Sequence, residues 1–219
     1  MARPQAANYD EVRRDILSRS AEVFARKGYA GTSIADLATG NGVSRGLLYH
    51  YFTSKEAILS EMLNTHLDAM LADVQAAATG LGDAEARFRA TVRTMVRINA
   101  TSKSLQVVLL TDLPNLGDAE RDCIVEKQRS ILAVFRDLIR EIDTDGRLDQ
   151  ATLKAQTMMF IGMINYTYIW YDPDGPVGPD AYADMAADTF LAGLRAGSGG
   201  TAINRPARPR LRRPAGSLR

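Results

Sequence analysis

The chain has 219 residues, a formal net charge of +1 and a hydrophobic fraction of 46%. This length is enough for one medium domain, or for a small head on a larger body, and the core that it can bury needs no disulfide or metal. Its single cysteine, Cys123, excludes an internal disulfide, and with His50 and His66 it makes a poor set of metal ligands. Because the sequence has neither an apolar run long enough to span a membrane nor a signal-peptide pattern, we expect a cytoplasmic protein without a membrane partner, metal or cofactor.

The small net charge conceals three differently charged regions. Residues 1–60 hold 8 basic and 6 acidic side chains, residues 61–194 hold 12 and 20, and residues 195–219 hold 7 arginines and no acid. A polyanion such as DNA would therefore be tolerated at the two ends and repelled by the middle.

Apolar residues recur at helical spacing along nearly the whole chain, which predicts an all-α fold. The first helix is expected from about Tyr9 to Lys27, where Gly28 ends it. A short second helix over residues 33–39 would be capped by Thr32.

A glycine turn and a third helix follow. The run Gly40-Asn41-Gly42 predicts a tight turn, and Ser44 caps a helix that extends to about Tyr51. Two short helices that cross through a glycine turn are typical of a helix-turn-helix.

The remaining chain predicts a larger helical body. A long helix capped by Ser54 should run from Lys55 to about Thr79. Further helices are expected over residues 83–101, 104–113, 118–141, 149–171 and 179–196, with Asp83, Asp118 and Asp149 as N-caps. The intervening run at 172–176, Asp-Pro-Asp-Gly-Pro, is a loop.

The segment from Thr32 to Lys55 has the chemistry of a DNA reader. Near the start of the third helix, exposed residues reach base edges and phosphates in a major groove. They are Ser44, Arg45, Gly46, Leu47 and Tyr49. Arg45 can donate two hydrogen bonds to guanine, and Tyr49, Tyr51 and Lys55 can donate to phosphates.

This segment resembles the TetR family of one-component regulators. The resemblance rests on Phe24-Ala25-x-x-Gly28-Tyr29, Thr32-Ser33-Ile34-x-x-Leu37-Ala38 and Gly42-Val43-Ser44-x-Gly46-x-Leu48-Tyr49-x-Tyr51-Phe52-x-x-Lys55. It implies an all-helical homodimer with a DNA-binding head and a ligand-binding body, usually a repressor. By position, Ser33, Arg45 and Leu47 match base-reading residues, and Thr32, Ser44, Tyr49, Tyr51 and Lys55 match phosphate-facing residues.

We therefore expect three regions: a helix-turn-helix domain over 9–55, a ligand-binding and dimerisation domain over 56–196, and a disordered tail over 197–219. The tail would either add sequence-independent affinity for DNA or have no role in binding. The resemblance implies that the last two helices, 149–171 and 179–196, form the dimer interface.

The resemblance also implies a cavity inside the body. Its candidate lining residues are Met62, His66, Met70, Met95, Asn99, Met159, Met163, Asn165 and Tyr166. The methionines suit a deformable wall, and Asn99, Asn165 and Tyr166 could anchor a ligand, although each could equally be an ordinary core residue.

The tract from Trp170 to Pro176 suggests a ligand class. It is similar to a loop of TetR members that control fatty-acid and acyl-CoA metabolism, although it could serve only to join two helices. An acyl-CoA or another long apolar molecule is thus a leading hypothesis for the effector.

The predicted function is that of a transcriptional regulator, which binds a palindromic operator as a homodimer and is released by a small apolar ligand. The family resemblance implies that it is a repressor. An enzyme is the main alternative, but the sequence contains no nucleotide-phosphate loop, paired metal motif or nucleophile elbow. A helical scaffold without DNA binding would leave the cap, the glycine turn and Arg45 unexplained.

Overall fold

The computed structural model describes residues 3–196, and the tail predicted over 197–219 lies outside them. The helices are α1 (Arg3–Lys27), α2 (Ile34–Asn41), α3 (Arg45–Tyr51), α4 (Lys55–Ala78), α5 (Ala84–Thr101), α6 (Lys103–Thr111), the 3-10 turn η1 (Leu113–Asn115), α7 (Asp118–Ile142), α8 (Gln150–Asn165), α9 (Thr167–Trp170) and α10 (Pro179–Ala196). The described residues contain no strand, so the all-α prediction is confirmed.

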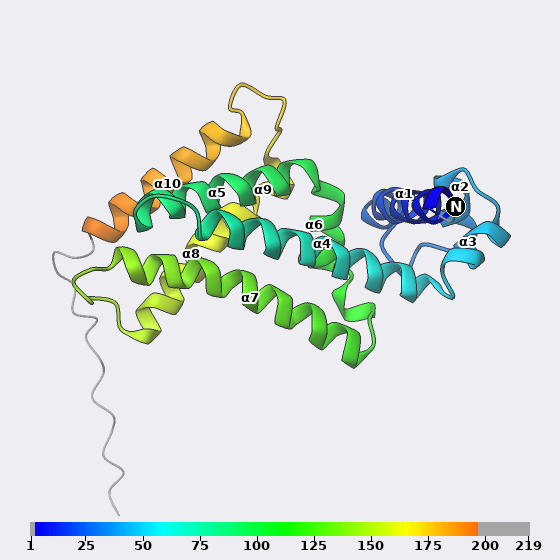
Figure 1. The fold of residues 1–219 in the computed structure, drawn as a ribbon, viewed down its shortest axis with the longest axis horizontal. Helices are drawn as coiled ribbons and strands as arrows, with labels where there is room; N and C mark the ends of the chain where they lie inside the picture. The colour runs from blue at the N-terminus through cyan, green and yellow to red at the C-terminus, as the bar shows by residue number, and fades with distance from the viewer. Residues whose placement is uncertain (1–2, 197–219) are drawn as a thin grey trace, which may run out of the picture.

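Helices α1, α2 and α3 form a small head at one end of an elongated molecule (Figure 1). Phe24, Leu37 and Leu48, one from each helix, are buried in its core. Burial of these side chains locks the crossing of α2 and α3, since apolar area removed from water stabilises the packed arrangement.

The cap of α2 differs from the sequence prediction by one residue. Ser33, and not Thr32, is the N-cap: its Oγ accepts a hydrogen bond from the amide of Asp36 at 3.1 Å, and the Asp36 carboxylate accepts from the Ser33 amide at 2.9 Å. This reciprocal capping box satisfies two amides that the first helical turn leaves free.

The turn after α2 is also shorter than predicted. Asn41 is the last residue of α2, because its buried side-chain amide donates to the Leu37 carbonyl at 2.8 Å and to Ser20 Oγ at 3.0 Å. The reversal is made at Gly42 alone, whose φ of 67° lies in the left-handed region that favours glycine.

Helix α4 joins the head to the body and runs between α5 and α7 (Figure 1). The end of the body farther from the head contains a cluster of four packed phenylalanine rings. Phe88 of α5 lies 5.0 Å from Phe160 and 5.7 Å from Phe190, and Phe135 lies 6.0 Å from Phe160. This aromatic cluster joins α5, α7, α8 and α10 into one core.

Helix boundaries in the body mostly match the prediction. Asp83 and Asp149 are N-caps, each accepting an amide hydrogen bond at 2.8 Å. Asp118 is instead the first residue of α7, with Gly117 as its cap. The helix predicted over 149–171 is divided at Tyr166 into α8 and α9; Thr167 Oγ1 donates to the Ile164 carbonyl at 2.7 Å, a type of side-chain bond that often accompanies bent helices.

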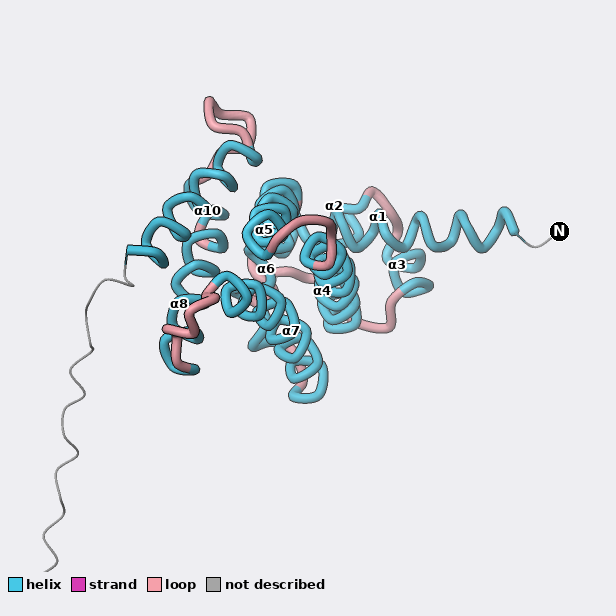
Figure 2. Tube along the Cα trace, turned by 60° about the vertical axis from the view of Figure 1, so that its left-hand side comes forward, coloured by secondary structure: helices cyan, strands magenta, loops and turns pink. Residues whose placement is uncertain are grey.

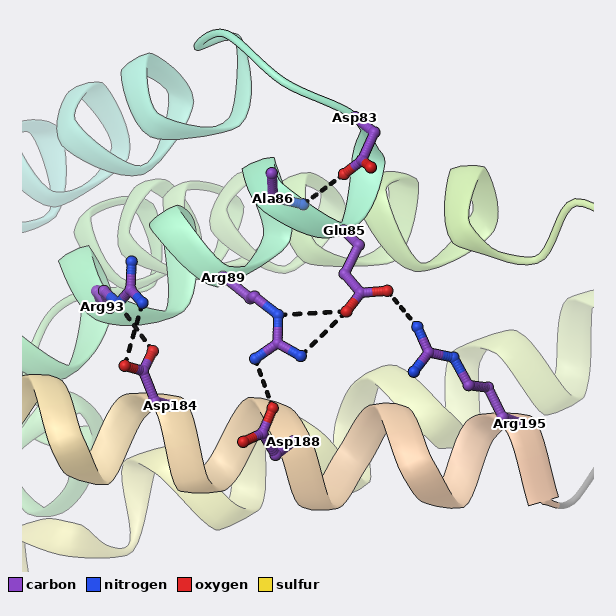
Figure 3. A network of polar contacts seen from close by, with 8 residues as sticks. All are labelled: Asp83, Glu85, Ala86, Arg89, Arg93, Asp184, Asp188 and Arg195. Atoms are coloured by element: carbon purple, nitrogen blue, oxygen red, sulfur yellow. Dashed lines mark hydrogen bonds and ion pairs between the residues drawn. The ribbon is translucent and has the colours of Figure 1, made fainter.

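Helices α8 and α10 lie on the side of the body away from α1 (Figure 2). A ladder of ion pairs fixes α10 antiparallel to α5 (Figure 3). Arg93 donates to both carboxylate oxygens of Asp184 at 2.8 and 3.0 Å. The other rungs are Arg89–Asp188, Arg97–Asp180 and Arg195–Glu85. None of the helices described is both long and apolar enough to cross a membrane.

Candidate nucleic-acid interface and ligand cavity

Helix α3 presents its first turn to solvent. Ser44 caps the helix, accepting from the Leu47 amide at 3.1 Å, and Leu48 alone is buried against the head. Arg45 and Gly46 are exposed, and Leu47 and Tyr49 remain 40% and 54% exposed. An exposed leucine and tyrosine beside an arginine form a surface with hydrogen-bond donors and apolar contact area, as base reading requires.

Ser33 is the N-cap residue at the start of α2. Its side chain is exposed, and it donates to the Asp36 carboxylate at 2.6 Å. The pKa of Asp36 lies well below its usual range, first because Lys27 donates to this carboxylate at 2.5 Å and second because Ser33 does. Asp36 therefore stays ionised and keeps the α2 cap in place.

Two predicted phosphate contacts, Lys55 and Thr32, are turned inward. Lys55 Nζ donates to the carbonyls of Tyr29 and Thr32 at 2.7 and 2.8 Å and lies 4.0 Å from the centre of the Tyr29 ring. Thr32 is buried, with its hydroxyl donating to the Gly28 carbonyl at 2.7 Å. Both side chains hold the loop between α1 and α2, because they donate to carbonyls of this loop, which no helix satisfies.

Tyr51 is half-buried at the end of α3. Its ring lies 4.6 Å from the ring of Tyr9, and Arg13 donates to its carbonyl at 2.7 Å. Arg13 also forms two hydrogen bonds of 2.5 Å with Glu61, which raise the pKa of its guanidinium, and lies 4.5 Å from the centre of the Phe52 ring. Sequence reasoning missed Arg13, whose partners are 38 and 48 residues away.

Two further hydrogen bonds connect the segment after α6 to the junction between head and body. Asp112, at the end of α6, accepts from the amide of Tyr29 at 3.2 Å, and Glu56, in the first turn of α4, accepts from the amide of Gly117 at 3.0 Å. The side chain of Asp112 is buried. The segment that follows α6 thus contacts both the loop after α1 and the start of α4.

A cavity of about 220 Å³, partly open to solvent, lies among the helices of the body. It is lined by Leu67, Met70, Met95, Gln106, Leu109, Leu110, Gln128, Ile131, Leu132, Met158, Ile161 and Asn165, which come from α4, α5, α6, α7 and α8. Most of these side chains are apolar, and Gln106, Gln128 and Asn165 supply the polar groups. This composition suits a ligand with an apolar part and few hydrogen-bonding atoms.

The structure brings together only some of the nine residues expected at the cavity. Met70, Met95 and Asn165 line it. Met62 is buried, and His66 and Asn99 lie one helical turn from Met70 and Met95 respectively. None of these three lines it, and neither do Met159, Met163 and Tyr166. The last three are exposed on the surface, because the apolar run that contains them covers two opposite faces of the chain there.

Three polar side chains in the body have buried atoms without a hydrogen-bond partner among the described residues. These atoms are Asn99 Nδ2 and Oδ1, Asn165 Oδ1 and His66 Nε2. Burial lowers the pKa of His66 to about 4, so this imidazole is neutral near pH 7. Unpaired polar atoms are unfavourable inside a protein, and those near the cavity are available to a polar group of a ligand. In the described part of the chain, no cluster of three or more His, Cys, Asp or Glu side chains could hold a metal ion.

A three-helix head with an exposed third helix, attached to a helical body with a mostly apolar cavity, is the architecture of a helix-turn-helix transcriptional regulator. Residues 16–62 match the family model for bacterial regulatory proteins of the tetR family, and residues 81–194, more than half of the chain, match the tetracyclin repressor-like C-terminal domain. The chain belongs to the TetR family of DNA-binding transcriptional regulators.

Known relatives agree with this membership. A TetR-family transcriptional regulator from Bordetella parapertussis 12822 has 40% sequence identity and a TM-score of 0.79, over 82% of this chain and 94% of that one. The transcriptional repressor KstR2 of Rhodococcus jostii (strain RHA1) is 26% identical over 185 residues, covering 83% and 90% of the two chains. The transcriptional activator FasR of Mycolicibacterium smegmatis (strain ATCC 700084 / mc(2)155) is 26% identical over 186 residues, 84% of each.

Proposed function

We propose that the protein is a homodimeric repressor, without catalytic activity, that binds a palindromic operator and is released from it by a small ligand with an apolar part. The exposed first turn of α3, which presents Arg45, Leu47 and Tyr49, is the observation that carries this proposal. Three large or charged side chains on a short exposed helix contribute nothing to the core of the head, and all three can reach a DNA groove.

Base reading is assigned to Arg45, Leu47 and Ser33, and phosphate binding to Ser44 and Tyr49. Gly46 has a separate role. A Cβ added there would meet nothing closer than Ser44 Oγ at 3.9 Å, so the packing of the head does not require glycine. Without a side chain, the backbone of α3 can approach the DNA closely.

Dimerisation is assigned to the outer face of α8, α9 and α10. We call this the outer apolar face; its exposed side chains are Met159, Met163, Tyr166, Ile169, Trp170 and Met185. Contiguous exposed apolar side chains of this size mark an interaction surface. The same face on two copies would form an isologous two-fold interface, which matches a palindrome with half-sites about 34 Å apart or somewhat more.

Release is assigned to the contact between α6 and the head. Gln106, Leu109 and Leu110 of α6 line the cavity, and three residues after Leu109 the Asp112 carboxylate holds the Tyr29 amide. Since α4 also lines the cavity, a ligand there contacts both helices that reach the head. A ligand that prefers a shifted α6 and α4 would favour a head separation unsuited to the operator.

The proposal is tested with the full chain and the DNA upstream of its own gene. We expect a dimer by sedimentation, a specific shift in a mobility assay, and higher transcription of the adjacent gene when the regulator is deleted. Specific binding with lower transcription on deletion would indicate an activator. Absence of specific binding would contradict the assignment of this operator, and a folded monomer at micromolar concentration would contradict the dimer.

A further inference from the structure

A second hollow, lined by cations, lies between α7 and α8. It has a volume of about 350 Å³ and is lined by Arg129, Leu132, Ala133, Arg136, Arg140, Gln150, Leu153, Lys154, Thr157 and Met158. We call it the basic groove. Four of its ten lining residues are cations and none is an acid, although the surrounding region from 61 to 194 has 20 acidic and 12 basic side chains.

The spacing of these residues places the cations on facing helix surfaces. On α7, Arg129, Arg136 and Arg140 are separated by seven and four residues, the spacing of one helix face. On α8, Lys154 follows Gln150 by one turn. The two helices are consecutive in the chain, and both rows line the same groove.

The nearby acids leave most of this positive charge available. Arg136 and Arg140 share a single carboxylate oxygen of Asp137, at 3.0 and 2.9 Å, so one acid partners two guanidinium groups. Arg129 has a long contact of 3.4 Å with Glu126. Lys154 is exposed and makes no ion pair within residues 3–196. Clustered, partly solvated cations of this kind bind phosphate groups.

The basic groove adjoins the apolar cavity. Leu132 of α7 and Met158 of α8 line both hollows and form their common wall. Met158 is 49% exposed, and an unbranched thioether changes rotamer readily. A ligand could therefore place an apolar chain in the cavity and a charged head in the groove by displacing one flexible side chain.

We propose that the basic groove binds the phosphorylated head of an amphiphilic effector whose acyl chain occupies the adjoining cavity. This inference rests on the proposed function, and it specifies the class of effector: a phosphate-bearing molecule with an apolar tail, such as an acyl-CoA or a lysophospholipid. Because the cavity volume of about 220 Å³ is below the roughly 300–1,000 Å³ of typical ligand sites, short or branched chains fit best without rearrangement of the methionines.

Direct calorimetric titration of the DNA-free full-length dimer tests this site. The probes are octanoyl-CoA, free coenzyme A, octanoic acid and octanoyl lysophosphatidic acid. We expect at least one of the two phosphorylated amphiphiles to bind more tightly than both coenzyme A and octanoic acid, and its affinity to fall as salt rises. The stronger of these two identifies the source of the phosphate.

Variants locate the head group. The double substitution Arg140→Gln and Lys154→Gln should weaken that amphiphile about tenfold or more, with the binding of octanoic acid unchanged. The matched control is Arg121→Gln with Lys103→Gln, which removes an arginine and a lysine outside the groove and should leave both affinities unchanged. Circular dichroism checks that the variants are folded.

Three results would overturn the inference: no binding of either amphiphile, equal affinity of free coenzyme A and its thioester with no binding of the lipid, or equal weakening by the groove and control variants. Because the titrations contain no DNA, their outcome is independent of operator binding. Failure of the proposed operator function would therefore be seen separately, in the mobility assay.

Discussion

Arg45 and Lys55 are both cations of the helix-turn-helix segment, but the fold gives them opposite environments. Arg45 is exposed on α3, whereas the Lys55 ammonium is held by two backbone carbonyls and the face of Tyr29. Local sequence could predict the exposure of Arg45, because it follows the α3 cap. It could not predict the orientation of Lys55, which depends on how the loop after α1 folds back over the start of α4. Substitution of Lys55 should therefore act mainly on the stability of the head.

The first prediction is that Arg45→Ala weakens operator binding by about 1–3 kcal/mol and relaxes the base preference at one position of each half-site. The loss arises because alanine cannot form the two parallel hydrogen bonds that a guanidinium makes with guanine. Fluorescence anisotropy with the operator and with single-base variants measures both effects. Arg121→Ala, at the start of α7, is the control and should bind like the unmodified protein. Unchanged affinity and selectivity of Arg45→Ala would assign base reading elsewhere.

The second prediction concerns His66 and pH. Its pKa is about 4 in the folded protein because of burial, against an ordinary value of 6.5. The unfolded chain therefore binds the proton more readily, and the folded state loses stability as pH falls from about 6.5 to about 4. The contribution lost is up to about 3 kcal/mol of unfolding free energy.

His66→Gln should remove this contribution. Urea unfolding over the same pH range measures the free energy of unfolding of the unmodified protein and of the variant. Because both chains share every other titrating group, the difference between their curves isolates His66. Between pH 7 and pH 4, we expect the free energy of unfolding of the unmodified protein to fall by about 3 kcal/mol more than that of His66→Gln. Parallel curves would show that the imidazole is not desolvated.

At the scale of helices, local signals predicted the elements well and their ends less well. Asp83, Asp149 and Ser44 cap helices as expected, since an N-cap acts on amides two or three residues away. The break at Tyr166 had no such signal, because an apolar run without periodicity gives no indication of a bend. The ion-pair ladder between α5 and α10 joins residues 83 to 110 positions apart (Figure 3), beyond the reach of any local pattern.

The third prediction concerns the contact between α6 and the head. Asp112→Ala removes the acceptor of the Tyr29 amide. We expect the affinity for ligand to stay the same while ligand-induced release of operator becomes weaker, because displacement of α6 no longer reaches the loop after α1. A coupling of about 1–3 kcal/mol is typical of such links, and most of it should disappear.

Asp112→Asn keeps a carbonyl acceptor at the same place and should retain most of the coupling. Asp118→Ala serves as the control on the same segment, because it removes an exposed carboxylate whose ion-pair partner in the described part of the chain is Arg121. Operator release is followed by anisotropy during titration with the ligand identified by calorimetry. If Asp112→Ala released the operator as effectively as the control, the link would run through α4 or through the packing of α6 against α1.

At the scale of the whole molecule, sequence patterns indicated a head, a body and an interface but not which side chains belong to each surface. An apolar run such as that of α8 predicts burial on several sides of the helix. In the fold, the residues of this run are divided between the core and the surface. Phe160 and Ile164 enter the core, whereas Met159, Met163 and Tyr166 remain exposed. An apolar helix between a core and a partner surface has the same composition on both faces, so composition could not assign the residues. Only the packing of α8 against α5 and α7 separates them.

A test of the dimer must therefore use a residue that lies outside the core, and Phe190 is not such a residue. From the sequence, a charge at Phe190 would be expected to break the dimer or the fold. The structure places this ring in the aromatic cluster, 4.8 Å from Phe160 and only 7% exposed. A carboxylate there would have no partner, so unfolding is the expected outcome, and loss of the dimer would not identify an interface.

The last prediction therefore uses Met159, which is 68% exposed in the protomer and belongs to the outer apolar face. Met159→Asp should leave the protomer folded, since the side chain contributes little to its core, but should place two carboxylates in a two-fold interface without partners. We expect sedimentation as a monomer at micromolar concentration and a large loss of operator affinity, because each molecule then meets a single half-site. Leu81→Asp, an equivalent change at a fully exposed loop residue away from this face, should remain dimeric. Equal thermal stability of the two variants separates dissociation from unfolding, and a dimeric Met159→Asp protein would place the interface on a different surface.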